Sequence, residues 1–343
     1  MAHGERRRGV ALAVTGALLL AAMLAGVSAG AIGMSPSGIL STLAGRVGVH
    51  FGTPLPSVDA DVLVLIRLPR VLLTAMVGGM LALAGASYQG VFRNPLADPY
   101  LLGAAAGAGL GATLVIAYAP GGAGPFGALP AAAFVGALSG VGLAYGLGSM
   151  ASRQGGGSAT LLLAGVAVAS FLTAIQTVVQ QEHSDSLREV YSWILGQLGA
   201  GHWEDIRMVL PYMIVSTVVL LVAGRALDVL SVGDDEAQTL GVRPRRVRFV
   251  VLLAASLGTA SAVAVSGLIG FVGLVVPHIV RRLAGGSYRT VLPVSLLGGA
   301  AFLVVADLVA RTVLAPTELP IGVVTAFVGA PFFAALLRVG SSS

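Results

Sequence analysis

The chain of 343 residues is 56% hydrophobic and only 10% charged, whereas a typical soluble domain carries about 25% charged residues. This composition excludes a soluble globular protein and predicts an all-α, polytopic membrane protein with room for about ten spans of about 20 residues each. All 20 basic residues are arginine and cysteine is absent, which excludes a Walker-type phosphate loop ending in Gly-Lys-Ser/Thr, a disulfide framework and a thiolate metal site.

The first predicted span, residues 10–32, follows three arginines, Arg6 to Arg8. A basic start before an apolar run is also typical of a cleaved secretory signal, which is the alternative. Because the run is longer than an ordinary signal core, we expect an uncleaved span. The arginines predict that its N-terminus faces the cytoplasm.

Five further spans are predicted within residues 65–223 and four within residues 250–338, at residues 71–91, 100–119, 129–150, 160–179, 208–223, 250–266, 269–280, 291–310 and 321–337. Threading them from a cytoplasmic N-terminus places most arginine-bearing loops inside and the Pro-rich or acidic connections, such as residues 35–61, outside. The net charge of +5 therefore indicates membrane topology and not nucleic-acid binding. We expect a single domain, residues 1–343, in a cytoplasmic membrane, with both termini cytoplasmic.

Arg67, Arg70 and Arg311 do not follow this topology, because they fall at the predicted outer face. Each could be an interface anchor whose charged head reaches the lipid headgroups. Arg311 also lies four residues after Asp307 on one helical face, so the two side chains could form an intrahelical ion pair. Asp307 is the one acid that lies well inside an apolar run.

Polar groups inside the predicted spans are sparse. Gln176 and Gln180 stand four residues apart on the fifth span, where they could line a hydrated translocation path, although interhelical hydrogen bonding explains the pair equally well. The sequence has no recognisable nucleophile motif and no constellation of metal ligands. We therefore expect no catalysis, no metal and no cofactor in this chain.

Residues 224–249, called the central segment below, carry both acids and a dense arginine cluster between two apolar runs. Residues 227–240 are predicted to form one short helix that ends at Gly241. Its apolar side and its exposed side carry three residues each: Leu227, Leu230 and Leu240, and Asp234, Asp235 and Glu236. We interpret the segment as a cytoplasmic surface offered to another protein, with a solvated connecting loop as the alternative.

A faint internal repeat is also present, because Arg67-Leu-Pro-Arg70 opens the second span and Arg243 to Arg246 open the seventh. Five spans separate the two starts, so the repeat would be inverted, as in carriers that alternate access across the membrane. This favours a second hypothesis, a secondary transporter driven by an ion gradient. Against it, a proton-coupled carrier normally needs intramembrane carboxylates or histidines, which this chain hardly supplies.

Two blocks of motifs carry a resemblance to a known family. The first comprises Arg67-Leu-Pro-Arg70, Gly85-Ala-Ser-Tyr-Gln89 and Arg93-Asn-Pro-Leu-Ala-Asp-Pro99. The second comprises Gly267-Leu-Ile-Gly-Phe-Val-Gly-Leu-Val-Val-Pro-His278, Ala306-Asp307 with Ala310-Arg311, and Pro316-Thr-Glu-Leu-Pro320. In one register from about residue 65 to residue 337, these motifs resemble the signature of the FecCD permease family, the BtuC-like membrane subunits of importers for iron chelates, haem and cobalamin.

The resemblance implies the ten-helix permease fold of type II ATP-binding cassette (ABC) importers, with an inverted repeat and a homodimeric assembly. Two cytoplasmic ATPase subunits would hold ATP and Mg, and one periplasmic or lipid-anchored binding protein would deliver the substrate. Iron siderophores rank first as cargo, before haem and cobalamin.

The resemblance also implies roles for individual residues. The binding protein would dock on Arg67, Arg70 and Arg311. The translocation path and its gates would include Asn94, Leu96, Ser158 and Ala159, besides Gln176 and Gln180. The central segment would be the coupling element that fits a cleft of the ATPase, through Leu230, Asp234, Asp235, Glu236, Ala237, Leu240 and Gly241.

Overall fold

The computed structural model describes residues 2–30, 33–119, 127–152, 158–199 and 201–340, and every regular element in these ranges is a helix. Ten helices overlap the ten predicted spans: α1 (Ala2–Ser28), α4 (Leu68–Phe92), α5 (Ala104–Tyr118), α6 (Ala128–Ser152), α7 (Ser158–Glu182), α9 (Trp203–Val222), α12 (Pro244–Ser266), α13 (Val272–Ala284), α14 (Tyr288–Thr312) and α15 (Ile321–Gly340). The shorter helices between them are α2 (Pro36–Arg46), α3 (Ser57–Val62), α8 (Leu187–Ile194), α10 (Gly224–Val232) and α11 (Asp234–Thr239).

The lengths of these helices confirm a multi-pass membrane protein. Among the described residues, seven helical stretches are long and apolar enough to cross a membrane, and α5 and α15 are shorter apolar helices. Helix α13 has only 13 residues and carries two arginines in its last turn. By length and composition, seven crossings are supported, so the predicted number of ten stays a prediction.

The second span begins earlier than the sequence pattern indicates. Helices α3 and α4 form one stretch from Ser57 to Phe92, joined by a π-helical turn at Leu63–Arg67. Pro69 lacks the N–H that would bond to the carbonyl group of Leu65, and a widened turn before it is a common adjustment to such a loss. The predicted outer connection, residues 35–61, therefore contains two helices, α2 and most of α3.

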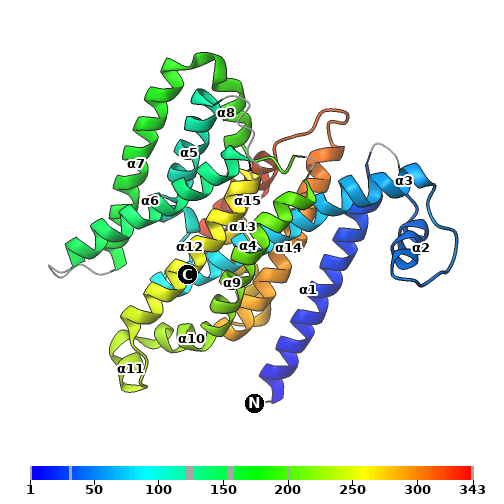
Figure 1. Cartoon of the computed structure of the whole chain (residues 1–343). Helices are drawn as coiled ribbons and strands as arrows, with labels where there is room; N and C mark the ends of the chain where they lie inside the picture. The colour runs from blue at the N-terminus through cyan, green and yellow to red at the C-terminus, as the bar shows by residue number, and fades with distance from the viewer. Residues whose placement is uncertain (1, 31–32, 120–126, 153–157, 200, 341–343) are drawn as a thin grey trace.

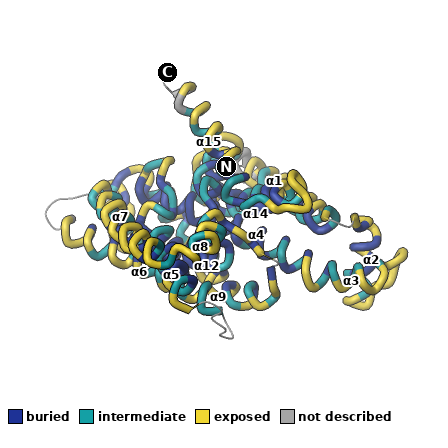
Figure 2. The backbone as a smooth tube through the Cα atoms, turned by 90° about the horizontal axis from the view of Figure 1, so that it is seen from above, coloured by how far each residue is buried: buried dark blue, intermediate teal, exposed yellow. Residues whose placement is uncertain are grey.

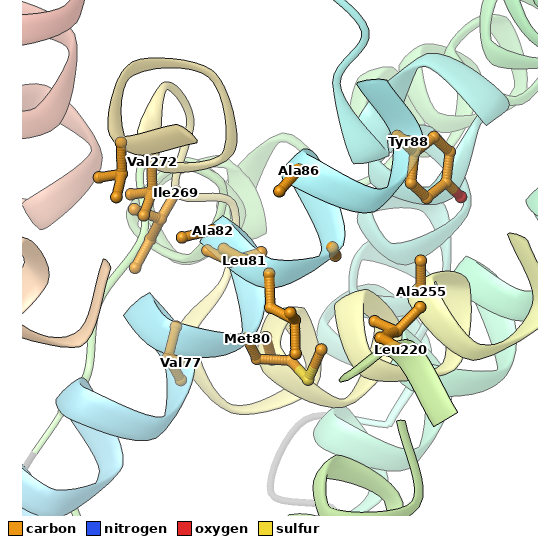
Figure 3. Packing of buried hydrophobic residues seen from close by; sticks show 14 of the residues in the cluster. Val77, Met80, Leu81, Ala82, Ala86, Tyr88, Leu220, Ala255, Ile269 and Val272 are labelled. Carbon is orange, nitrogen blue, oxygen red and sulfur yellow. The ribbon is translucent and has the colours of Figure 1, made fainter. Parts of the chain in front are cut away.

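Helix α4 lies at the centre of the bundle, where every residue from Val77 to Phe92 is buried. Its close neighbour is α14, and the two backbones approach so tightly that a Cβ atom on Gly78 would lie 2.4 Å from the carbonyl oxygen of Gly299. Figure 3 shows side chains of α4, such as Met80 and Tyr88, near residues from α9 and α12. Small residues permit this close packing, as is usual between membrane helices.

The motif Gly85-Ala-Ser-Tyr-Gln89 joins α4 to two neighbours. A Cβ atom on Gly85 would lie 2.1 Å from the carbonyl oxygen of Gly273 at the start of α13, and the Gln89 side-chain amide donates to the same oxygen over 3.0 Å. Tyr88 shares a 2.7 Å hydrogen bond with Ser256 of α12, and Arg281 Nη1 donates to Gln89 Oε1 over 2.7 Å. These contacts give the motif a packing role.

The helices define two ends of the molecule. The N-terminus, α10 and α11 lie at one end, called the lower end, and α3, α8 and the loop after α14 lie toward the other, called the upper end (Figure 1). Helix α1 packs on α14 along one edge of the bundle. Helix α15 extends away from the body, and its tip is largely exposed (Figure 2).

Candidate functional site

The central segment folds as two helices, so the predicted single helix over residues 227–240 is wrong. Helix α10 ends at Gly233, whose φ of 158° and ψ of 162° leave the helical region, and α11 starts at the next residue. Glycine adopts such an extended backbone at low cost and is unfavourable inside a helix. Gly241 follows α11 with a φ of +79°, which confirms the predicted end of the helical segment.

The break at Gly233 changes which side chains share a face. Leu227 and Leu230 of α10 are buried as predicted, and Ala237 of α11 is buried with them. Leu240 was predicted on the same apolar side, but it is 66% exposed because α11 no longer continues the direction of α10. Together with exposed Asp235 and Glu236, Leu240 forms a surface that no other described part of the chain covers.

Asp228 attaches α10 to the start of α14. Its carboxylate accepts hydrogen bonds from Ser287 Oγ over 2.8 Å and from the Tyr288 amide over 2.5 Å, and it lies 3.5 Å from Arg289 Nε. A carboxylate at this place satisfies a free N–H group and the positive end of the helix dipole. The sequence gives no sign of this contact, because no local pattern pairs residues 60 positions apart.

Asp234 attaches α11 to two further helices. Arg248 of α12 donates to it through Nη1 over 2.8 Å and Nη2 over 2.6 Å, and Arg93 at the end of α4 also pairs with it. The expectation that Asp234 is exposed in the same way as Asp235 and Glu236 is therefore wrong, because two arginines draw it partly into the bundle. The lower end thus has a segment tied by two carboxylates to α4, α12 and α14.

The upper end carries an ion-pair network centred on Asp307, which is 1% exposed. Arg70 donates to Asp307 Oδ1 through Nε over 3.2 Å and Nη2 over 2.9 Å. The same guanidinium group donates to both carboxylate oxygens of Glu318, over 3.0 and 2.8 Å. Arg311 Nε lies 2.9 Å from Asp307 Oδ2, the expected i,i+4 ion pair, although the atoms are not aligned as a hydrogen bond.

Arg311 and Arg67 also hold the end of α1. Arg311 Nη2 donates to the carbonyl oxygen of Gly26 over 3.0 Å, and Arg67 Nη1 donates to those of Val27 and Ser28 over 2.9 and 3.1 Å. Arg67, Arg70 and Arg311 are thus largely buried and engaged within the chain. Glu318, 52% exposed, is the member of this network that solvent reaches most easily.

The loop between α4 and α5 holds the predicted gate residues Asn94 and Leu96. Asn94 Oδ1 accepts a hydrogen bond from the Leu96 amide over 2.9 Å, and the Leu96 side chain is exposed. Asp98 accepts from the Tyr100 amide over 2.8 Å. Burial raises the pKa of Asp98 to about 6, and the hydrogen bond from Tyr100 opposes that rise.

The other predicted path residues lie on α7. Ser158 and Ala159 are its first residues, Ala159 is exposed, and the glycines of residues 155–157 lie outside the described residues. Gln176 is buried and points at α5, since a Cβ atom on Gly109 would lie 3.0 Å from Gln176 Oε1. Gln180 is half-buried. Gln176 therefore lies at the contact between α7 and α5, and its role in a translocation path stays a prediction.

An apolar pocket of about 600 Å³ lies where α8, the start of α13 and α15 meet, and its lining includes Leu195, Phe271 and Phe327. Phe327 is 76% exposed at the edge of this pocket. The sequence pattern gives no sign of this pocket, because its three walls come from separate parts of the chain.

These features define the class of the protein. It is a helical, multi-pass membrane protein whose lower end carries an ordered segment with an exposed face and whose upper end carries buried ion pairs.

The FecCD transport family matches residues 18–339, and the chain belongs to that family. The cobalamin import system permease protein BtuC of Halobacterium salinarum is 44% identical over 299 residues, which cover 87% of this chain and 78% of that protein. The hemin transport system permease protein HmuU of Yersinia pestis is 41% identical over 278 residues, covering 78% and 80%. A solved inward-facing structure of a metal-chelate type ABC transporter superposes with a TM-score of 0.82 at 28% identity, covering 95% of this chain and 98% of that one.

Proposed function

We propose that the chain is the membrane-spanning permease subunit of an ABC importer for a metal chelate. Iron siderophores are the first candidate cargo, before haem and cobalamin. The observation that carries the proposal is the central segment, in which Asp228 and Asp234 fix two short helices to the bundle and leave the face with Asp235, Glu236 and Leu240 exposed. The similarity to permease proteins of cobalamin and hemin transport systems supports the same role.

The proposed topology has ten crossings, an inverted repeat and both termini in the cytoplasm of a bacterial cell. Because the N-terminus and the central segment lie at one end (Figure 1), a single orientation would place Arg6 to Arg8 and Arg243 to Arg248 on the same side of the membrane. This is the distribution that the positive-inside tendency favours. The upper end would then face the binding protein.

The proposed assembly contains two copies of this chain, two ATPase subunits and one binding protein in a lipid bilayer. ATP and Mg would be held by the ATPase, and the exposed face of α11 would contact it. The apolar pocket beside α15, with exposed Phe327, supports a second copy at that edge. Closure of the ATPase pair would move the two central segments together and switch the bundle between outward-open and inward-open states.

The proposal is tested by reconstituting the chain in vesicles with its cognate ATPase and a binding protein loaded with a ferric siderophore. We expect uptake only when ATP and the ATPase are both present, and continued uptake when ion gradients are dissipated. Uptake that proceeds without ATPase, or that stops when the gradients are removed, would favour the secondary transporter instead.

We also propose that Arg70, with Arg67 and Arg311, contributes to docking of the binding protein. Arg70 already donates to Glu318 with both ends of its fork, so an acidic residue of the partner would have to displace that carboxylate. Reversing the arginines to glutamate is a poor test, because it would also break buried contacts to Asp307 and α1. Neutralising Glu318, which competes with the partner for Arg70, is a better test because it leaves those buried contacts in place.

Glu318→Gln is therefore expected to tighten docking of the binding protein by about fivefold at low ionic strength, since an exposed pair of this kind contributes up to about 1 kcal/mol. Surface plasmon resonance with the permease immobilised in nanodiscs measures the change. Asp185→Asn is the matched control, because it removes the same charge from an exposed upper-end residue outside the network. Unchanged or weaker docking for Glu318→Gln would contradict the docking role of Arg70.

A further inference from the structure

A groove of about 860 Å³ runs between α1, α13 and α14 toward the lower end of the bundle. Helix α1 packs against α14 but leaves a gap to α13, and each helix lines the gap with one stripe of residues at helical spacing. The volume falls within the range of about 300–1,000 Å³ that is typical of ligand pockets. Neither the central segment nor the upper-end ion pairs take part in this groove.

The walls of the groove are apolar along nearly their whole length. Val14 and Leu18 of α1 and Leu283 of α13 contribute large side chains that stay more than half exposed. Gly298 of α14 lines the groove, where an added Cβ atom would meet only a methyl group of Val276, at 3.3 Å. Such a surface is suited to a long, flexible hydrocarbon chain and would be unfavourable in contact with water.

The lower mouth of the groove is charged. Arg6 and Arg7 are its only charged lining residues, and both lie one turn below Val10, where the apolar stripe of α1 begins. The stretch of α1 that is apolar enough to cross the membrane starts at Arg6, so these two guanidinium groups lie at the level of lipid headgroups. Arginine binds phosphate through charge and through its planar set of donors.

We propose that this groove binds one anionic phospholipid, with the headgroup phosphate on Arg6 and Arg7 and an acyl chain along the apolar stripes. Basic pockets between membrane helices are suited to such headgroups, and charge distinguishes an anionic lipid from the zwitterionic lipids that surround any membrane protein. The bound lipid would fill the gap between α1 and α13 and tie the first span to the rest of the bundle. The proposal requires membrane insertion only and is independent of the transported substrate.

The test is native mass spectrometry of the full-length chain released from micelles that contain phosphatidylglycerol or phosphatidylcholine. We expect one retained phosphatidylglycerol per chain and little phosphatidylcholine. Arg6→Gln with Arg7→Gln should lower the preference for phosphatidylglycerol roughly 25-fold, since each arginine at an anionic membrane surface contributes about fivefold. Inorganic phosphate, added as a separate arm, should not displace the lipid, because it cannot occupy the apolar stripes.

Matched variants separate the groove from general effects of charge and bulk. Arg245→Gln with Arg246→Gln removes two exposed arginines elsewhere at the lower end and should leave retention unchanged. Val14→Trp should fill the groove and abolish retention of both lipids, whereas Leu20→Trp, on an exposed part of α1 outside the groove, should not. Equal retention of the two lipids by the original chain would overturn the proposal. So would unchanged lipid retention in the variant with Arg6→Gln and Arg7→Gln, or a loss of retention in the control variants as large as in the groove variants.

Discussion

Asp307→Asn is expected to lower the free energy of unfolding by about 3 kcal/mol. The carboxylate lies between Arg70 and Arg311, and removing one member of a buried ion pair typically costs about 3–5 kcal/mol because the remaining charge stays desolvated. We expect the lower end of that range, since Arg70 keeps Glu318 and Arg311 keeps the carbonyl oxygen of Gly26. Unfolding in mixed micelles of SDS and lipid measures the change.

Asparagine has nearly the same shape as aspartate. The lower free energy of unfolding would therefore result from the lost charge and not from changed packing. Asp185→Asn, at an exposed position near the upper end, is the control and should change stability by less than about 0.5 kcal/mol. A combined Asp307→Asn and Arg311→Gln variant should recover part of the loss, because one buried charge then no longer lacks its partner. An Asp307→Asn protein as stable as the original would show that the two arginines do not depend on this carboxylate.

The apolar runs of the sequence predict the helices well because burial in lipid depends on local composition. A helix is found in each of the ten predicted segments, and the i,i+4 pairing of Asp307 with Arg311 follows from helical spacing alone. The early start of the second span was not predictable by hydropathy. Residues 57–62 are polar enough to read as a connection, yet they continue into the helix that follows.

The partners of the polar residues depend on tertiary packing, which no local pattern contains. Glu318 binds Arg70 across 248 positions and Gln89 binds Arg281 across 192. The charges of the central segment are visible in the sequence. A helix continued through Gly233 predicts a buried Leu240, however, and that prediction is wrong because the helix breaks at Gly233. The docking and gating roles of individual residues stay predictions.

Asp234→Asn is expected to uncouple ATP hydrolysis from transport. Asp234 is the carboxylate that ties α11 to Arg93 at the end of α4 and to Arg248 of α12, so its loss would let the central segment move without moving those helices. Hydrogen bonds to charged groups contribute about 1.5–3 kcal/mol, and 1.4 kcal/mol corresponds to a tenfold change. We expect uptake per ATP hydrolysed to fall about tenfold in vesicles, while the ATPase still binds.

Asp235→Asn provides the matched control, since the neighbouring carboxylate is exposed and has no partner within the described chain. If Asp235 contacts the ATPase, its loss should weaken binding of that subunit and leave uptake per ATP unchanged. The two variants then change different quantities, although they remove the same charge from adjacent positions. Equal effects of both on uptake per ATP would mean that the attachment of the segment to α4 and α12 does not transmit the motion, and that contact with the ATPase alone determines the coupling.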